Sequence, residues 1–337
     1  MPSFTPQLVL VQKAALDYPL GRELKERFEK QGIELVVYEK RTPFFRHKSF
    51  RDSYRIFKRT VVLLVWRQGS FQTCKPSAHY QLPLTSGCPG FCQYCYINTN
   101  LGRRPYVKVY VNVEDILQRC LGYIEQRRPE ITVFEGAATS DPVAVEGWTG
   151  SLRKAVEFFA PLADAKFRFV TKYTDVDGLL GVAHGGKTEV RFSLNCIYIL
   201  DRFEKGVPGL RSRLEAAKKC FEAAYPVGFL IAPIFVFKGW REQYSALFRE
   251  IKDYLPAKAD VFFELITHRF TARSKKIILD AYPGTEVPLD EAERSFKHGQ
   301  FGYGKYVYPP DVMAELKEFF VSEIARLFPG ARILYFV

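Results

Sequence analysis

The chain has 337 residues, 47% of them hydrophobic, which is enough for one large domain with an addition or for two domains and excludes a largely disordered chain. Its seven cysteines are odd in number and irregularly spaced, unlike a disulfide framework, so we expect a reducing, cytoplasmic compartment. The start of the chain lacks the charged and apolar regions of a signal peptide, and the strongest apolar run, residues 61–66, is too short to span a membrane. We therefore expect no membrane partner.

A formal net charge of +12 favours a polyanionic partner, because clustered Lys and Arg bind phosphate backbones by releasing counterions. About half of this excess lies in residues 39–59, where eight cationic side chains stand against two acidic ones and five aromatic residues are interleaved. The stretch fits a nucleic-acid contact and a solvated helix face with an aromatic inner side equally well. Its composition leaves both interpretations open.

Residues 1–70 alternate between short apolar runs and helical spacing. We expect strands at residues 8–11, 33–38 and 60–66 and helices at residues 14–31 and 51–58. This β-α-β-α-β order predicts an N-terminal α/β addition. The polar residues 68–78 that follow are expected to form a connector.

Residues 79–270 repeat a strand-then-helix pattern. We expect strands at residues 79–84, 131–135, 167–172, 189–194, 227–235 and 260–266, and helices at 113–126, 148–159, 176–180, 210–223 and 243–254. Six such repeats with apolar strands imply a parallel sheet covered by helices, so we predict an α/β fold built on a partial (β/α)6 barrel. Residues 271–337 are predicted to add a C-terminal β-hairpin at 296–308, a helix at 312–327 and a strand at 333–337.

Three cysteines stand at the spacing C-x3-C-x2-C in a loop rich in glycine and proline: Cys88, Cys92 and Cys95. A [4Fe–4S] cluster asks for four ligands, so three close cysteines would leave one iron free to hold another group. A zinc site closed by His79 or Cys74, a disulfide and chance are the competing interpretations, but no paired zinc-ligand spacing is present. The spacing therefore favours an iron–sulfur cluster with one open iron.

Polar residues recur where the predicted strands end. They fall in the segments 135–141, 168–172, 191–195 and 264–269. In a barrel of this kind the chemistry lies at the carboxyl ends of the strands, and the cysteine loop follows the first strand. Any one of these residues fits a helix cap or a solvated position, but their recurrence at successive strands predicts a pocket.

The cysteine spacing, with an aromatic residue just before the third cysteine, resembles that of the radical S-adenosylmethionine (SAM) superfamily. The resemblance implies that the open iron chelates SAM and that an electron from the cluster releases a 5′-deoxyadenosyl radical. The cofactor carries that chemistry, while the protein orients it and excludes water. A reducing electron donor of flavodoxin or ferredoxin type is also implied.

Nearly the whole chain is similar to one family within that superfamily, spore photoproduct lyase. The similarity is carried by the cysteine loop with Tyr94 and Tyr96, by the segments 135–141, 168–172 and 191–195, and by residues 304–306. The family implies repair of a UV lesion, 5-thyminyl-5,6-dihydrothymine, in the DNA of the spore core of a spore-forming bacterium. A radical removes hydrogen from C6 of the lesion, the methylene bridge breaks, and a cysteine returns a hydrogen to the product.

The resemblance also assigns roles to residues of this chain. Cys88, Cys92 and Cys95 would bind iron, and Tyr94 and Tyr96 would relay hydrogen to regenerate SAM. The residues that would surround SAM are Ser140, Lys172, Ser193 and Asn195, and those that would hold the lesion are Tyr303, Lys305 and Tyr306. The lesion would have to leave the base stack to be reached.

Ala138 departs from the family pattern, because the family has its hydrogen-donor cysteine at this place in Glu-x-x-Cys-Thr-Ser-Asp. A methyl group is no thiol donor. By alternation along its strand Cys196 should face away from the SAM residues, while Cys74, Cys120 and Cys220 fit structural roles. Either the chain is an engineered variant or the donor lies elsewhere, and we expect initiation and DNA binding with impaired repair.

Two other classes of function fit parts of the sequence. A radical SAM enzyme that modifies tRNA or a protein would suit the basic charge equally well. A DNA-binding protein with a structural iron–sulfur cluster would need a fourth protein ligand and would not cleave SAM.

Overall fold

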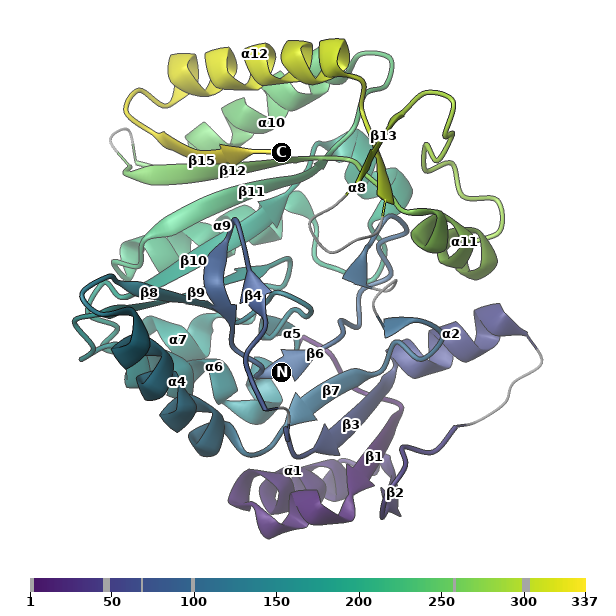
Figure 1. Cartoon of the computed structure of the whole chain (residues 1–337), viewed down its shortest axis with the longest axis vertical. Coiled ribbons are helices and arrows are strands. Elements are labelled where there is room, and N and C mark those ends of the chain that lie inside the picture. The colour runs from purple at the N-terminus through teal and green to yellow at the C-terminus, as the bar shows by residue number, and fades with distance from the viewer. Residues whose placement is uncertain (1–2, 45–48, 68, 98–100, 257–258, 299–303) are drawn as a thin grey trace.

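The computed structural model describes residues 3–44, 49–67, 69–97, 101–256, 259–298 and 304–337. Two twisted sheets dominate the molecule, with a separate two-stranded hairpin beside them (Figure 1). The smaller sheet lies at the N-terminal end of the molecule, and the larger sheet curls so that most helices cover its outer face. Within the described residues, no helix is both long and apolar enough to cross a membrane.

The smaller sheet has the strand order β2-β1-β3-β7-β6. Its strands are β1 (Leu8–Gln12), β2 (Glu34–Tyr38), β3 (Thr60–Leu64), β6 (Thr85–Ser86) and β7 (Val107–Tyr110). The predicted helix at 14–31 is divided into the 3₁₀ helix η1 (Lys13–Asp17) and α1 (Pro19–Lys30), because Pro19 begins a new helix at its first position. Helix α2 (Phe50–Lys58) is capped by the Ser49 side chain, which accepts a hydrogen bond from the Asp52 amide at 3.1 Å.

The larger sheet has the strand order β15-β12-β11-β10-β9-β8-β5-β4. Its strands are β4 (Thr73–Cys74), β5 (Ala78–Gln81), β8 (Thr132–Glu135), β9 (Ala165–Thr171), β10 (Thr188–Leu194), β11 (Val227–Ile234), β12 (Val261–Thr267) and β15 (Arg332–Phe336). All neighbours are parallel except β4 and β5. The six strands from β5 to β12 are the predicted half-barrel, so the α/β partial-barrel fold is confirmed.

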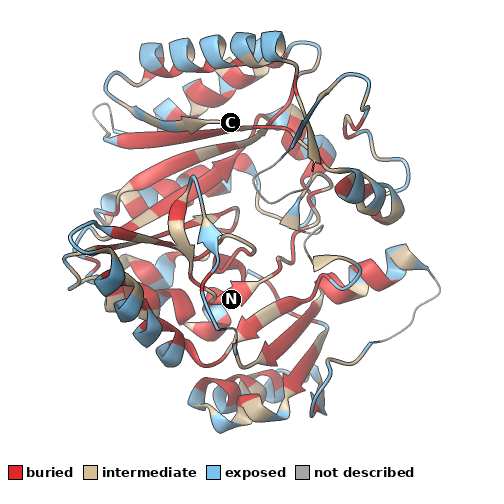
Figure 2. Cartoon of the chain, viewed as in Figure 1, coloured by how far each residue is buried: buried red, intermediate tan, exposed pale blue. Residues whose placement is uncertain are grey.

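Helices cover the outer face of the half-barrel. They are α4 (Val113–Arg127), α5 (Val143–Thr149), α6 (Ser151–Phe159), α7 (Asp177–Leu180), α8 (Ile197–Phe203), α9 (Leu210–Glu222), α10 (Trp240–Tyr254) and α12 (Pro310–Leu327). Helix α11 (Ala272–Ala281) lies to the side, next to α2 (Figure 1). Figure 2 shows that the central strands of the larger sheet are mostly buried. Alternate strand residues such as Val190, Phe192 and Leu194 are buried in the core. The residues between them, such as Arg191, face the interior of the half-barrel.

Several elements differ from the sequence prediction. The predicted helix at 148–159 is interrupted at Gly150, whose φ of +59° is left-handed, so that α5 ends there and α6 begins. The expected connector at 68–78 contains β4, which forms a hairpin with β5. Strand β7 and helices α8 and α11 were not expected.

The sheets cross the predicted bounds of the three segments 1–70, 79–270 and 271–337. Strands β6 and β7 lie beyond residue 70 and complete the N-terminal sheet, and β15 joins the half-barrel beside β12. The division into these three units stays a prediction about independent folding. The predicted C-terminal hairpin is present as β13 (Ser295–His298) paired antiparallel with β14 (Gly304–Val307).

Candidate active site

The cysteine loop is fastened at both ends to the mouth of the half-barrel. Near its start the Gly87 amide donates to the Thr139 carbonyl at 2.8 Å, in the segment that follows β8. Further along, the Phe91 amide donates to the Lys205 carbonyl at 2.7 Å, just after α8. Gly87 has a φ of +85°, and a Cβ there would lie 2.2 Å from the Tyr106 carbonyl oxygen, so only glycine fits.

The three cysteines of this loop share one environment. Cys92 is buried and Cys88 and Cys95 are half-buried, and all three thiols are free. Burial raises the pKa of Cys88 to about 12, with the charge of Cys95 among the further causes, and burial also raises the pKa of Cys92, to which Cys95 and Cys88 contribute. The three sulfurs therefore lie within electrostatic range of one another.

This donor set fits an iron–sulfur cluster better than a single ion. Within the described parts of the chain, no group of three or more His, Cys, Asp or Glu side chains is arranged to hold one metal ion. In a cluster the ligands bind different irons, so their sulfurs are spread more widely. Coordination would also deprotonate thiols that burial otherwise keeps neutral.

The segment after β8 brings a polar surface to the loop. Ser140 forms a bridge with Gly87, and its buried hydroxyl has no hydrogen-bond partner within the described residues. Asp141 accepts hydrogen bonds from the Thr171 hydroxyl at 2.7 Å and the Lys172 amide at 2.8 Å, and burial raises its pKa to about 6. A buried hydroxyl without a partner beside a charged group is where a polar ligand would be expected.

A buried carboxylate, Glu204, organises the other side of the mouth. It accepts a hydrogen bond from Lys172 Nζ at 2.8 Å, one from Arg213 Nη2 at 2.6 Å and one from the Tyr94 hydroxyl. Burial alone would raise the pKa of Glu204, but the two cations lower it to about 2. Glu204 therefore stays ionised and fixes the position of Lys172 and Tyr94.

The other predicted SAM residues lie at the end of β10. Arg213 Nη1 donates to the Ser193 carbonyl at 2.9 Å. The Asn195 amide group donates to the Pro233 carbonyl at 2.7 Å and accepts from the Cys196 amide at 3.0 Å. Cys196 itself is buried, and its thiol interacts with Tyr244 of α10.

The two predicted relay tyrosines point to different surroundings. Tyr94 is held by Glu204 and packs on Phe235, with ring centroids 5.7 Å apart. Tyr96 is 60% exposed, and its hydroxyl donates to the Ala138 carbonyl at 3.1 Å. Although the residue as a whole is exposed, desolvation around its hydroxyl raises the pKa of Tyr96. The charges of Cys95 and then Cys74 are the next causes, so both sulfurs lie within electrostatic range of this phenol.

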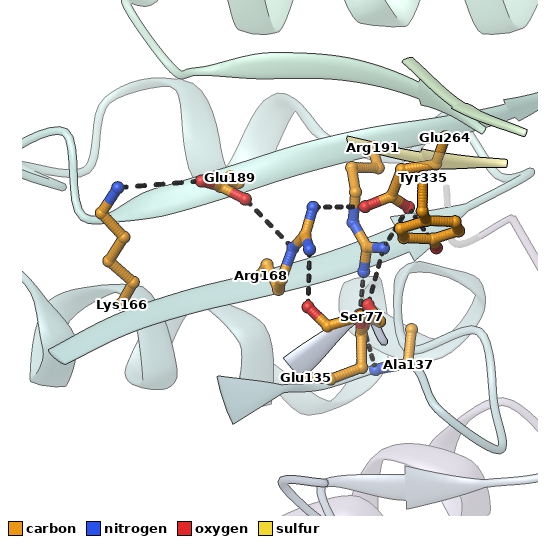
Figure 3. A network of polar contacts seen from close by, with 9 residues as sticks. All are labelled: Ser77, Glu135, Ala137, Lys166, Arg168, Glu189, Arg191, Glu264 and Tyr335. Carbon is orange, nitrogen blue, oxygen red and sulfur yellow. Dashed lines mark hydrogen bonds and ion pairs between the residues drawn. The ribbon is translucent and has the colours of Figure 1, made fainter. Parts of the chain in front are cut away.

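A second buried charge network crosses the interior of the half-barrel (Figure 3). Arg168 donates to Glu264 at 2.6 Å and to the Ser77 carbonyl at 2.7 Å. Arg191 donates to Glu264 at 2.7 Å and also contacts Glu135. The sequence placed these residues in segments at the strand ends, but Arg168, Arg191 and Glu264 lie within their strands and only Glu135 ends its strand.

The C-terminal hairpin places two predicted lesion contacts beside the mouth. Tyr306 exchanges backbone hydrogen bonds with Phe270 and stacks on its ring, with centroids 5.2 Å apart. Lys305 stands directly opposite Lys297, and burial followed by the charges of Arg269 and Lys297 lowers its pKa. Tyr303, the third predicted contact, lies outside the described residues.

A basic pocket of about 510 Å³ lies on another side of the cysteine loop. Its lining includes Phe91 of the loop together with Arg51, Arg55, Arg59 and Lys205. The Arg59 guanidinium stacks over the Phe91 ring, 5.4 Å from its centroid. The basic stretch noted in the sequence thus contributes to a pocket next to the loop.

Sequence reasoning missed the residues that hold the site together. Glu204 follows a short helix and Arg213 lies within a longer one, and neither belongs to a motif. The alanine at position 138 was a signal that another cysteine could be important, because the family implies a thiol there. Cys74 was nevertheless passed over, because the polar residues around it indicated a connector. Its place in the larger sheet depends on the unexpected β4–β5 hairpin.

A half-barrel of parallel strands, with a C-x3-C-x2-C loop docked across its mouth, is the architecture of a radical SAM enzyme. The profile described as spore photoproduct lyase matches residues 4–337. The chain belongs to the spore photoproduct lyase family. This match favours lesion repair over the alternatives of tRNA or protein modification and of a structural cluster.

Two curated relatives span nearly the full length of the chain. Spore photoproduct lyase of Clostridium acetobutylicum is 46% identical over 330 residues, which is 98% of each chain. Spore photoproduct lyase of Bacillus subtilis (strain 168) is 43% identical over 337 residues, covering 99% of this chain and 98% of the relative.

One solved structure shows the family with ligands. It is a spore photoproduct lyase mutant with bound AdoMet and dinucleoside spore photoproduct, in which one cysteine is replaced by alanine and one serine by cysteine. It is 44% identical to this chain, covers 99% of this chain and 100% of its own, and superimposes with a TM-score of 0.96.

Proposed function

We infer that the chain repairs the spore photoproduct lesion of DNA, reverting it to two thymines by radical SAM chemistry. The full-length family match together with the three-cysteine loop carries this conclusion. We also propose that it works in the cytoplasm of a spore-forming bacterium, in the spore core, where reducing conditions suit its free cysteines.

The test is anaerobic reconstitution with iron, sulfide, SAM and dithionite, followed by product analysis on dinucleoside spore photoproduct. Lesion should disappear with the unmodified chain and persist with Cys92→Ala, whose thiol is the most buried of the three. Persistence of the lesion with a fully loaded unmodified chain would contradict the function.

The cofactors fit the residues at the mouth. We propose that Cys88, Cys92 and Cys95 hold the [4Fe–4S] cluster. SAM would be bound by the free hydroxyl of Ser140 and by Lys172, Ser193 and Asn195. When bound, the two groups together supply the radical that removes a hydrogen atom from the lesion. The chain's own task is to hold SAM rigidly, and Glu204 does so by fixing Lys172 through an ion pair with a 2.8 Å N–O distance.

The hairpin beside the mouth supplies a surface for damaged DNA. Lys297 and Lys305 are paired across its two strands, and Arg269 lies within electrostatic range of both Lys305 and Tyr96. Like charges placed opposite each other weaken a hairpin unless an anion lies between them. We propose that a phosphate of the lesion strand binds here, with Tyr303 and Tyr306 against the bases.

The basic pocket beside Phe91 suits the electron donor. It lies next to the cysteine loop, and its lining carries Arg51, Arg55, Arg59 and Lys205. We propose that an acidic protein of flavodoxin or ferredoxin type docks on this pocket, since opposite charges steer such encounters. The sequence had raised the other possibility, that the same cations bind nucleic acid.

Charge reversal separates these two uses of the pocket. Arg51→Glu with Arg55→Glu should slow SAM cleavage driven by reduced flavodoxin and leave dithionite-driven cleavage unchanged. Lys252→Glu with Lys317→Glu, at exposed positions on α10 and α12, is the control. Weaker DNA binding with unchanged flavodoxin kinetics would assign the pocket to nucleic acid instead.

Ala138 leaves the last hydrogen transfer without the donor that the family implies. The prediction of impaired repair rests on the interpretation that the remaining cysteines are structural. That interpretation holds only if none of these cysteines reaches the product. Cys74 is the cysteine for which this has to be decided.

A further inference from the structure

Six of the seven cysteines lie in the cluster loop or are buried against the outer helices. Three belong to the cluster loop. Cys120 and Cys220 are buried in the outer helices α4 and α9, and Cys196 is buried against α10. All seven fall within the described residues, so the elimination covers the whole set. Cys74, which is half-buried on β4, remains.

Cys74 lies on β4, the edge strand of the larger sheet, and Ala138 follows β8 of the same sheet. Its strand is paired with β5, where Cys74 stands opposite Ala78. Strand β5 is in turn paired with β8, where Gln81 stands opposite Glu135, three residues before Ala138. The hairpin that carries Cys74 and the segment that carries Ala138 are therefore neighbours in the sheet.

The interior charge network fixes these two segments relative to each other (Figure 3). Ser77, in the turn of the Cys74 hairpin, donates its hydroxyl to Glu135 at 2.8 Å, and its carbonyl accepts from Arg168. The other oxygen of Glu135 accepts from the Ala137 amide at 3.0 Å. One carboxylate thus binds the hairpin on one side and the residue before Ala138 on the other.

The mutant structure described above has the same arrangement of residue types. Its alanine replaces a cysteine and its new cysteine replaces a serine, at positions 64 residues apart. Cys74 and Ala138 are also 64 residues apart in this chain. The chain thus carries the same pair of residue types as the mutant, which has AdoMet and the lesion bound.

We propose that Cys74 is the catalytic hydrogen donor of this chain, in place of the thiol missing at position 138. After the methylene bridge breaks, the S–H bond of Cys74 breaks homolytically and a C–H bond forms on the methylene carbon of the product thymine. The thiol becomes a thiyl radical and the product becomes closed-shell. This inference rests on the proposed function and replaces the expectation of impaired repair.

Tyr96 is placed to restore the thiol. Its phenol lies within electrostatic range of Cys74 and donates a hydrogen bond to the Ala138 carbonyl at 3.1 Å. Transfer of its O–H hydrogen re-forms the Cys74 thiol, and the tyrosyl radical recovers a hydrogen from the methyl group of deoxyadenosine, the product of the first abstraction. The hydrogens balance over the cycle, and no external reductant is consumed.

The electrostatics keep Cys74 in the form that this transfer needs. Burial and then the carboxylate of Glu135 raise the pKa of Cys74 to about 12. The group is therefore a thiol at neutral pH and retains the hydrogen atom that it has to donate.

Deuterium transfer tests the donor directly. In D₂O the thiol of Cys74 exchanges to S–D, so the unmodified chain should place deuterium in the thymine methyl group and release intact dithymine. Cys74→Ala should still consume lesion but lose this deuterium, form dithionite adducts and use severalfold more SAM per lesion. Cys74→Ala with Ala138→Cys should restore clean repair, and Cys220→Ala should behave like the unmodified chain.

A second measurement does not depend on turnover. Dinucleoside spore photoproduct should slow alkylation of Cys74, mapped by mass spectrometry, and leave Cys120 unreactive with or without it. Equal deuterium and dithymine yields from Cys74→Ala and the unmodified chain would overturn the proposal. If no variant consumes lesion, the repair function itself fails, and the hydrogen-donor role fails with it.

Discussion

The two buried charge clusters of this molecule use the same interactions for different purposes. At the mouth, Glu204 binds Lys172 and Arg213 and so orients single side chains beside the cysteine loop. In the interior, Arg168 and Arg191 join carboxylates and a backbone carbonyl from strands far apart in the sequence. The first cluster thus fixes single side chains, which we propose bind SAM, whereas the second positions whole segments of backbone.

The difference has a physical origin. Isolated buried charges are costly, so each cluster must be nearly complete to be stable. The Glu204 cluster is completed by neighbouring loops and helices, so changing it should mainly alter the site. The interior network is completed across the sheet, so changing it should alter the fold as well.

The largest effect is expected from the cysteine loop, which the first cluster serves. Cys92→Ala should abolish the brown chromophore and SAM cleavage completely, because the remaining two cysteines cannot hold the cluster. The overall fold should survive, since the interior network is untouched, and circular dichroism checks this. Cys74→Ala should keep iron and SAM cleavage. Loss of iron from Cys74→Ala would instead indicate a site closed by four cysteines.

Removing Arg191 tests the second cluster. Arg191→Met leaves Glu135 without its cationic partner and Glu264 with Arg168 alone. Breaking a buried pair in this way costs about 3–5 kcal/mol of unfolding free energy. Denaturant titration measures the loss. Arg211→Met, on the exposed face of α9, should change stability by only about 0.5 kcal/mol. Equal effects of the two substitutions would show that the network is not structural.

The sequence allowed the half-barrel to be predicted because its strands are continuous apolar runs. It also located the cysteine loop, because three cysteines at that spacing have few alternatives. The contact between Arg168 and Glu264 joins residues 96 positions apart, and no local pattern specifies it. Strand β4 has two residues, too few for alternation to be visible, so the place of Cys74 could not be predicted.

The pH dependence of stability tests the first cluster through Glu204. The folded-state pKa of Glu204 is lowered from 4.5 to about 2, which corresponds to about 3 kcal/mol in favour of the folded state. Because the pKa is lowered, this stabilisation is present above pH 4.5 and is lost as the pH falls towards 2. The stability difference between the unmodified chain and Glu204→Gln should therefore shrink over that interval, as measured by urea titration at several pH values. A pH-independent difference would contradict the assignment.

The smallest effect concerns two hairpin lysines for which the described residues offer no ion pair like those of the two clusters. Lys305 lies opposite Lys297 in the hairpin, so a like-charge contact remains that neither buried cluster tolerates. If a DNA phosphate relieves it, Lys305→Gln should reduce the slope of log K against log salt by about 0.9 on duplex DNA. The same substitution should stabilise the free protein by about 0.2–1 kcal/mol, since it removes the cross-strand repulsion.

Lys317→Gln on α12 is the matched control and should change neither quantity. A loss of hairpin stability without any change in the salt slope would mean that Lys305 serves the fold, as the paired charges do, and not the DNA.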